Sequence, residues 1–311
     1  MGRAAVAVSV SQFAAEVGED PRSDIQPAFV HGLTKEKHLM KQISSTLIDT
    51  SGKTRSGSGG GALRIGVDVG GTGIKAGIVD TATGILAAPT LQVPTPRPAT
   101  PEAVAAAMAE LVDTISARVG AAPASAPVGV ALPAVVRWGT TRSAANIDPG
   151  WLGLNVENFL AGRLNRGVCA LNDADAAGLA EVRFGAGRGI PGTVLVITLG
   201  TGIGSALVLN GQLVPNTELG HLELDGIAAE ARASALARER DGLNWYRYTE
   251  RLQRYFSRLE FLLAPDLIVV GGGISACSEN FLPGLRLDTP VVPARLENTA
   301  GITGAALQAA L

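Results

Sequence analysis

The stretch LRIGVDVGGTGIKAGIV, residues 63–79, decides the fold of this chain. Its apolar run at 63–68 is followed by a glycine-rich turn and then by a second β-rich run at 74–79. Two such runs joined by a glycine turn are typical of a β-hairpin. The stretch therefore predicts two paired strands, with Asp68 at the end of the first strand and the turn beside it.

The same pattern returns in the second half of the chain. Residues 193–209 read TVLVITLGTGIGSALVL, which is again an apolar run, a glycine turn and a returning apolar run. A third glycine turn, at 271–273, follows the apolar run at 267–270. Repeated units of this kind indicate a duplicated fold whose two halves face each other across a cleft.

Predicted strands alternate with predicted helices elsewhere in the chain. Thr100 followed by Pro101 is a helix start, and apolar residues then recur at helical spacing. Runs at 128–132 and 168–171 predict strands, and the second leads into an alanine-rich helix that ends near residue 184. A long helix is predicted at about 245–263. This alternation predicts an α/β fold.

Composition restricts the class of protein. Apolar residues make up 46% and charged residues 17% of the 311-residue chain, as in globular proteins. The formal net charge is -2, so nucleic acid and anionic membranes are not expected as partners. No apolar run reaches the roughly 20 residues of a membrane span. The two cysteines and three histidines are too widely spaced for a zinc site or a disulfide framework.

Residues 1–62 differ from the rest of the chain. They end in the stretch SGKTRSGSGGG, at 51–61, whose composition is that of a flexible linker. They also lack the apolar centre and the small-residue cleavage site of a secretory signal. We therefore expect residues 1–62 to be a mostly disordered extension and the protein to be soluble and cytoplasmic.

The three glycine turns are candidates for binding phosphate, because glycine lets main-chain N–H groups approach phosphate oxygens. One such turn alone is more often a plain hairpin, and none matches a Walker or dinucleotide motif. Together, with Asp68 and Thr72 in the first turn, they favour a phosphate or nucleotide site between two domains. The candidate phosphate-binding residues are Gly70, Gly71, Thr72, Gly73, Lys75, Gly200, Thr201, Gly202, Gly204, Gly271, Gly272 and Gly273.

Two acidic residues stand where strands are predicted to end. Asp68 could hold a divalent ion through water, or it could be an Asx-turn residue. Asp173 could accept a proton from a substrate hydroxyl that attacks a phosphoryl group. It could also cap the following helix, a role that Asp175 could fill equally well.

A carboxylate and an imidazole stand three residues apart at Glu218 and His221. Such a pair can hydrogen-bond vicinal hydroxyls, which need paired donors and acceptors. Glu230, with Ser234, opens the next predicted helix, where capping is the alternative interpretation. Asn146 is polar in a loop of small residues.

At these residues the sequence resembles the ROK family (repressor, open reading frame, kinase), within the sugar-kinase and actin-like superfamily. The matching motifs are DVGGTGIK at 68–75, ND at 172–173, LGTGIG at 199–204, ELGH at 218–221 and GGGIS at 271–275. More narrowly, NDADAAGLAE at 172–181 and PNTELGHLE at 215–223 resemble the actinobacterial polyphosphate glucokinases and the related glucomannokinases. The resemblance covers residues 63–311.

The resemblance implies a two-domain actin-like ATPase (ribonuclease H-like) sugar-kinase fold with an interdomain cleft. We expect a smaller domain from 63–172 plus 299–311 and a larger one from 173–298. The resemblance also implies a homodimer and Mg2+-dependent phosphoryl transfer from inorganic polyphosphate or ATP to the 6-hydroxyl of glucose, with mannose as a second acceptor. Asp173 would be the general base and Asp68 would assist Mg2+ through water. The sugar would be held by Asn146, Asn172, Asp173, Glu218, His221 and Glu230.

The sequence departs from the family pattern in three places. Many members carry a cysteine-rich zinc knuckle after the histidine, but residues 225–229 contain no cysteine, so His221 is expected to bind sugar rather than zinc. Ala134 replaces a usual glycine, and Ala276-Cys277 replaces a usually basic position, which leaves the donor preference open. The alternatives are an ATP-only hexose kinase and a non-catalytic sugar-sensing regulator. The regulator would need a helix-turn-helix module, for which residues 1–62 offer only one amphipathic stretch.

Overall fold

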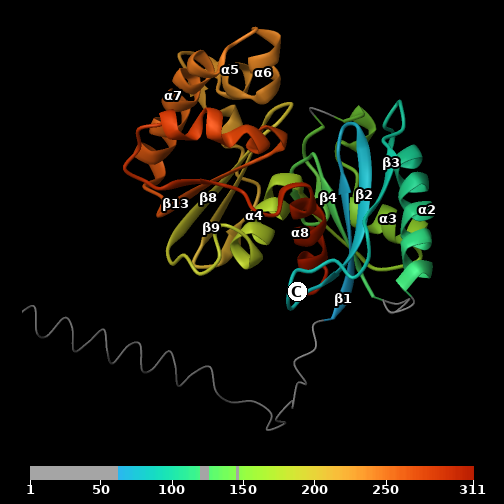
Figure 1. The fold of residues 1–311 in the computed structure, drawn as a ribbon. Helices are drawn as coiled ribbons and strands as arrows, with labels where there is room; N and C mark the ends of the chain where they lie inside the picture. The colour runs from blue at the N-terminus through green and yellow to red at the C-terminus, as the bar shows by residue number, and fades with distance from the viewer. Residues whose placement is uncertain (1–61, 120–125, 145–146) are drawn as a thin grey trace, which may run out of the picture. The chain divides into compact units, whose positions relative to one another are not determined.

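The structure is a computed structural model that describes residues 62–119, 126–144 and 147–311. Within these ranges the chain forms two five-stranded sheets and several helices (Figure 1). The predicted extension, residues 1–62, lies outside the described residues except for Ala62. No helix in the described ranges is long and apolar enough to cross a membrane.

The first sheet contains the hairpin predicted from residues 63–79. Its strands, in spatial order, are β3 (Leu91–Pro94), β2 (Gly73–Asp80), β1 (Leu63–Val69), β4 (Val128–Leu132) and β7 (Val168–Asn172). Strands β1, β2 and β3 pair antiparallel, whereas β4 pairs parallel to both β1 and β7. Asp68 lies directly opposite Lys75 in the β1–β2 pair, so the hairpin brings an acid and a base together at one end of the sheet.

The second sheet repeats this arrangement, which confirms the predicted duplication. Its strands, in spatial order, are β10 (Gln212–Val214), β9 (Ile203–Leu209), β8 (Thr193–Leu199), β13 (Leu267–Gly271) and β14 (Val291–Pro293). Three strands again form an antiparallel meander, and two further strands again run parallel to its first strand. The carboxyl ends of β1, β7, β8 and β13 carry Asp68, Asn172 and the three glycine turns.

Helices cover the outer face of each sheet (Figure 1). Helices α2 (Pro101–Val119) and α3 (Val156–Leu164) pack on the first sheet around one apolar core. Helices α5 (Glu230–Ala233) and α7 (Trp245–Leu263) pack on the second sheet around another, with α6 (Ala235–Arg240) between them in the chain. Helix α7 has the predicted bounds, and its buried residues recur at helical spacing: Tyr248, Leu252, Tyr255, Phe256 and Leu259.

Short elements complete the described chain. Two small hairpins are formed by β5 (Val136–Arg137) with β6 (Thr140–Thr141) and by β11 (Glu223–Leu224) with β12 (Ile227–Ala228). The single-turn and 3-10 helices are η2 (Pro149–Trp151), η3 (Leu219–His221), η4 (Gly273–Asn280), η5 (Leu282–Gly284) and η6 (Glu297–Thr299). The third glycine turn therefore leads into the 3-10 helix η4, whereas the first two lead into strands.

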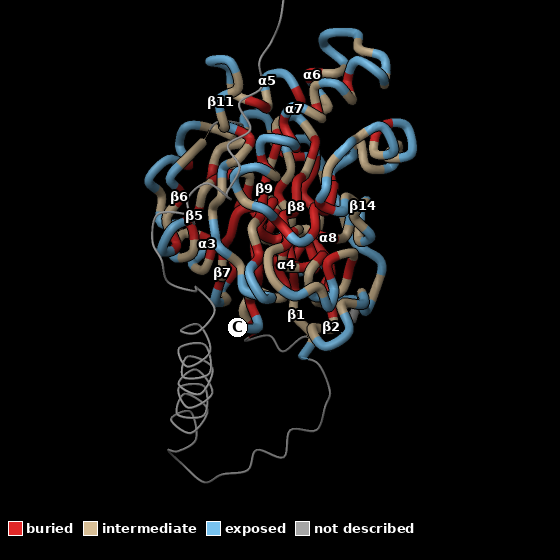
Figure 2. The backbone as a smooth tube through the Cα atoms, turned by 90° about the vertical axis from the view of Figure 1, so that its left-hand side faces the viewer, coloured by how far each residue is buried: buried red, intermediate tan, exposed pale blue. Residues whose placement is uncertain are grey.

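Helices α4 (Asp173–Phe184) and α8 (Ala300–Gln308) lie between the two sheets (Figure 1). Small residues allow this packing to be close. A side chain at Gly66 or Gly129 would collide with a backbone carbonyl of α8, and one at Gly304 would collide with the carbonyl oxygen of Ala176 in α4. Buried residues of both helices, among them Ala176, Ile302 and Ala305, form small clusters with the first sheet here, and Figure 2 shows buried segments along α4 and α8. The backbones of α4, α8 and the first sheet thus fix one another in place.

We predict that Gly304→Ala lowers the free energy of unfolding by about 1–3 kcal/mol, because the added methyl group must push α8 away from α4. Gly162→Ala is the matched control, because Gly162 lies in α3 with open space around it. It should leave the stability unchanged or raise it by up to about 1 kcal/mol. Urea unfolding followed by circular dichroism measures both variants, and equal stability of the two would contradict the proposed close contact.

Candidate active site

Two neighbouring cavities open at the carboxyl ends of the parallel strands. The large cavity, of about 520 Å³, is lined by the first two glycine turns and by residues from both sheets. The small cavity, of about 170 Å³, is lined by Asp68, Lys75 and the third glycine turn. Three residues line both cavities: Asp173, Thr198 and Gly272. Asp173 therefore stands where the two cavities meet.

Most of the predicted site residues come together here. Those that line the large cavity are Gly70, Gly71, Asn172, Asp173, Gly200, Thr201, Gly202, Gly204, Glu218, His221, Glu230 and Gly272. Asp68, Lys75 and Gly271 line the small cavity. Three predicted phosphate-binding residues line neither cavity: Thr72, Gly73 and Gly273. Asn146 lies outside the described residues.

Two glycines of the turns, Gly202 and Gly272, stand where a side chain would collide with its surroundings. The first two turns each close with a backbone hydrogen bond of 3.0 Å, one from Gly70 N and one from Gly200 N. A Cβ at Gly202 would lie 2.5 Å from the Glu230 carboxylate, so a side chain there would displace that acid. Gly272 is the one site glycine with a left-handed backbone (φ 83°), and a Cβ there would collide with the backbone of Leu199.

The helix cap before α4 differs from the prediction. Neither Asp173 nor Asp175 is the cap, because the Asn172 side chain accepts hydrogen bonds from Ala174 N (2.8 Å) and Asp175 N (3.1 Å). An asparagine with extended backbone is a strong N-cap, and its amide oxygen satisfies two of the unpaired N–H groups. The Asn172 side-chain nitrogen donates to the carbonyl oxygen of Ala134 (3.4 Å). The Asp173 carboxylate is therefore not needed to start the helix.

The surroundings of the Asp173 carboxyl group raise its pKa well above the usual value of an aspartate. Its pKa is raised to about 6, mainly by burial in the cleft and also by the negative charges of Asp68 and Glu218. A hydrogen bond from Ala174 N to Asp173 Oδ1 (2.8 Å) acts in the opposite direction. A carboxylate with such a pKa is a better proton acceptor near neutral pH than an exposed aspartate.

Asp68 shares the small cavity with Asp173 and Lys75. Burial raises the pKa of Asp68, and the Lys75 ammonium group lowers it. Helix α8 presses on this acid, because a Cβ at Gly301 would lie 2.8 Å from the Asp68 carboxyl carbon. The packing of α8 between the sheets thus also sets the position of Asp68.

Asp68 and Asp173 are two carboxylates of the small cavity that could hold Mg2+. The described residues contain no group of three or more His, Cys, Asp or Glu side chains arranged to hold a metal. Mg2+ in phosphoryl-transfer sites is held by one or two carboxylates together with water and phosphate oxygens. Asp68 and Asp173, which line the same cavity and repel each other, fit this donor set.

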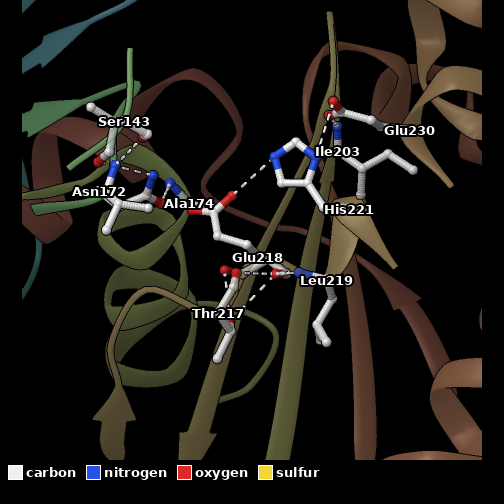
Figure 3. A network of polar contacts seen from close by, with 12 residues as sticks. Ser143, Asn172, Ala174, Ile203, Thr217, Glu218, Leu219, His221 and Glu230 are labelled. Atoms are coloured by element: carbon white, nitrogen blue, oxygen red, sulfur yellow. Dashed lines mark hydrogen bonds and ion pairs between the residues drawn. The ribbon is translucent and has the colours of Figure 1, made fainter. Parts of the chain in front are cut away.

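An imidazole between two carboxylates forms the far side of the large cavity (Figure 3). His221 Nε2 lies 3.7 Å from Glu218 Oε2, and His221 Nδ1 lies 3.5 Å from Glu230 Oε1. The exposed fractions of the side chains are 54% for His221, 41% for Glu218 and 28% for Glu230, so a ligand can reach all three. Burial raises the pKa of Glu218; the His221 imidazole lowers it and the Glu230 carboxylate raises it.

The backbone around this group is held by specific contacts. Glu230 accepts a hydrogen bond from Ile203 N (3.2 Å), and Ser234 rather than Glu230 caps the helix that follows. Buried Ser205 donates to the carbonyl oxygen of Thr217 and accepts from Leu219 N (3.0 Å). These contacts tie the segment that carries Glu218 and His221 to strand β9 (Figure 3).

Sequence reasoning missed two groups of residues. Ser205 and the segment 133–135 line the large cavity, and the position of Ser205 directly after the glycine turn was a signal for it. Buried Glu181 accepts hydrogen bonds from Ala186 N (2.7 Å) and from Arg295 N (2.9 Å) and Leu296 N (2.7 Å). It thereby fixes the segment that precedes η6 at the small cavity. Its contacts span more than 100 residues of sequence, and no local pattern indicates them.

Comparison with known proteins agrees with this geometry. Residues 64–235 match the family model described as "ROK family". The polyphosphate glucokinase of Mycobacterium tuberculosis (strain CDC 1551 / Oshkosh) is 47% identical over 243 residues, which are 78% of this chain and 89% of the mycobacterial protein.

Solved structures give the same result. The inorganic polyphosphate/ATP-glucomannokinase from Arthrobacter sp. strain KM is similar with a TM-score of 0.78 and 59% identity, over 80% of this chain and 98% of that one. The ROK family glucokinase from Streptomyces griseus, solved with glucose and AMPPNP, has a TM-score of 0.68 and 27% identity, and the match covers 79% of this chain and 98% of that one. These similarities confirm the predicted sugar-kinase fold. The chain belongs to the ROK family.

Proposed function

We propose that this protein is a polyphosphate glucokinase, which transfers a phosphoryl group from inorganic polyphosphate, and also from ATP, to the 6-hydroxyl of glucose with the help of Mg2+. Its similarity to the mycobacterial polyphosphate glucokinase and the Arthrobacter glucomannokinase supports this proposal. Mannose is the second acceptor that the name of the Arthrobacter enzyme suggests.

The position of Asp173 carries the proposal. On one side of it lies the large cavity with Glu218, His221 and Glu230, which suit hydroxyl groups. On the other side lies the small cavity with Asp68 and Lys75, which suit a metal-bound phosphate. A proton acceptor between a hydroxyl site and a phosphate site is what phosphoryl transfer to an alcohol requires.

In the proposed reaction Asp173 accepts the proton of the sugar 6-hydroxyl as its oxygen attacks the terminal phosphorus of the donor. The bond from that phosphorus to the bridging oxygen breaks, and the shortened polyphosphate or ADP leaves. The raised pKa of Asp173 matches it to this role near neutral pH. Glu218 and Glu230 would accept hydrogen bonds from other hydroxyls, and His221 would orient both acids.

The amide groups of the turns would hold the donor. Gly71 and Gly200 have open space above their Cα atoms, so phosphate oxygens can approach their backbones. Lys75 would neutralise negative charge on the transferring group. Mg2+, when bound near Asp68 and Asp173, would supply further charge neutralisation at the donor phosphates. Asn172 would donate to the sugar through its amide nitrogen, because its oxygen caps α4.

The proposal includes two domains, 63–172 with 299–311 and 173–298, and a homodimer as the active form. Each proposed domain is supported by its own sheet and its own apolar core. Closure of two domains around sugar and donor would exclude water and favour transfer over hydrolysis.

We predict glucose-dependent turnover with polyphosphate and Mg2+, measured as glucose 6-phosphate in a coupled assay. Asp173→Asn should lower kcat by a factor on the order of 10²–10⁴, because the amide cannot accept the proton. Asp113→Asn is the matched control, because Asp113 is exposed on α2 away from both cavities, and it should keep full activity.

The outcomes of this assay separate the candidate functions. Turnover with ATP alone would identify an ATP-dependent hexose kinase and contradict the polyphosphate proposal. If neither polyphosphate nor ATP supports phosphorylation of glucose or of mannose, the result would favour a sugar-sensing regulator. Equal activity of Asp173→Asn and Asp113→Asn would remove Asp173 from the role of general base.

We also predict the pH dependence of kcat/KM for glucose. Because the pKa of Asp173 is raised to about 6, its protonated, inactive form persists up to that pH. Below about pH 6 the kcat/KM for glucose should fall roughly tenfold per pH unit. In Asp68→Asn the fall in kcat/KM should begin at a lower pH, because the negative charge of Asp68, which raises the pKa of Asp173, has been removed. An acidic limb near pH 4 in the unmodified enzyme, the usual range of aspartate, would contradict the assignment.

A further inference from the structure

The large cavity has two walls that come from different sheets. The first wall is the segment 133–136, which follows β4 of the first sheet and lines the cavity with residues 133–135. The second wall is the segment 215–221, which follows β10 of the second sheet and lines the cavity with Glu218 and His221. A sugar that fills the cavity touches both walls, so the distance between them determines how well it fits.

One side chain joins these two walls. Asn216 Oδ1 accepts a hydrogen bond from Val136 N (3.0 Å), and Asn216 Nδ2 donates to the carbonyl oxygen of Val136 (3.0 Å). The amide group thus satisfies both backbone groups of one residue, as a neighbouring strand would. Val136 directly follows Val135, which lines the cavity, and Glu218 lies two residues after Asn216.

The backbone of Asn216 is anchored as firmly as its side chain. Asn216 N donates to Asp175 Oδ2 in α4 (2.8 Å), and Asp175 is only 1% exposed. The pKa of Asp175 is raised to about 7, mainly by burial, although the hydrogen bond from Asn216 acts in the opposite direction. Asn216 also has a left-handed backbone (φ 59°), which asparagine and glycine tolerate best. The backbone of Asn216 is therefore held in place, and this determines the direction of its side chain.

Among the described residues, the other hydrogen bonds that hold the two walls do not join one wall to the other. In the first wall, Asn172 holds Ala134 and Ser143 holds Val135, and both contacts stay on the side of the first sheet. In the second wall, Ser205 holds Thr217 and Leu219 on strand β9. The pair of hydrogen bonds between Asn216 and Val136 connects the first wall to the second.

We propose that Asn216 is a positioning residue that sets the width of the sugar cavity by joining its two walls. It does not touch the reacting atoms; it holds Glu218 and His221 at a fixed distance from segment 133–136. This inference rests on the proposed function in one respect, which is that the ligand of the large cavity is glucose. Loss of the join should weaken sugar binding in the ground state and the transition state alike, which raises KM and leaves kcat nearly unchanged.

The test compares Asn216→Gly with Asn216→Ala. Both remove the amide, but glycine keeps the left-handed backbone without strain, whereas alanine does not. Asn210→Gly is the matched control, because Asn210 is exposed, is also left-handed (φ 50°) and also accepts one backbone hydrogen bond, from Gly192 N (3.0 Å), at a turn that lines neither cavity. The measurements are the Kd of glucose by titration calorimetry, KM and kcat for glucose and for polyphosphate, and the midpoint of thermal unfolding.

We expect both Asn216 variants to raise the Kd and KM of glucose about tenfold, the effect of losing one to two hydrogen bonds. The KM of polyphosphate and the kcat should change by less than about twofold, and Asn210→Gly should match the unmodified protein. The inference is overturned if Asn216→Gly matches Asn210→Gly, or if the KM values of glucose and polyphosphate rise together. An unmodified protein that binds glucose without phosphorylating it would refute the proposed function, while the Kd values still decide the role of Asn216. An unmodified protein that binds no glucose would refute both.

Discussion

The close contact between α4 and α8 is the constraint on which the rest of the structure depends. Gly66, Gly129 and Gly304 let the backbones of the two helices and the first sheet approach within van der Waals distance, where any side chain would collide. Because α8 also presses on Asp68 through Gly301, and α4 begins at Asp173, this contact brings two carboxylates of like charge into one small cavity. Burial and, to a smaller extent, the repulsion between the two acids raise the pKa of Asp173, and binding of a divalent cation would relieve this repulsion. Packing of small residues far from the solvent thus determines the acid–base chemistry of the cleft.

The cleft itself is built from contacts that converge on few backbone segments. Ser205, Glu230 and Asn216 each hold a loop by hydrogen bonds to main-chain groups, and Ser205 and Glu230 also line the large cavity. Asn172 likewise has two roles, because its amide caps α4 and lines the same cavity. The duplicated sheets explain why two glycine turns face the same cavity from different halves of the chain. A family with this scaffold can change its sugar and its donor by changing these loops and keeping the two sheets.

The sequence predicted those features whose signal is local. Both hairpins, the bounds of α7 and the strand that runs into α4 follow from apolar spacing and from turn residues, and the structure confirms them. Asp173 and Asp175 were the two alternatives that the sequence offered for the helix cap, and neither fills this role, because Asn172 is an equally good cap residue and the chain path places it at the cap. The contacts of Asn216 with Val136 and of Glu181 with Arg295 join residues 80 and 114 positions apart, and no spacing rule reaches that far. Most of the candidate site residues could be named from motifs, whereas the groups that hold them in place could not.

A crystal structure of the protein with bound glucose tests the central claim most directly. The account predicts that glucose lies in the large cavity with its O6 atom at a distance of about 2.6–3.2 Å from the Asp173 carboxylate, and with other hydroxyls on Glu218, His221 and Glu230. It also predicts that O6 points toward the small cavity, where Asp68 and Lys75 would meet the donor phosphate. Glucose bound outside the large cavity, or with its O6 atom turned away from Asp173, would contradict it.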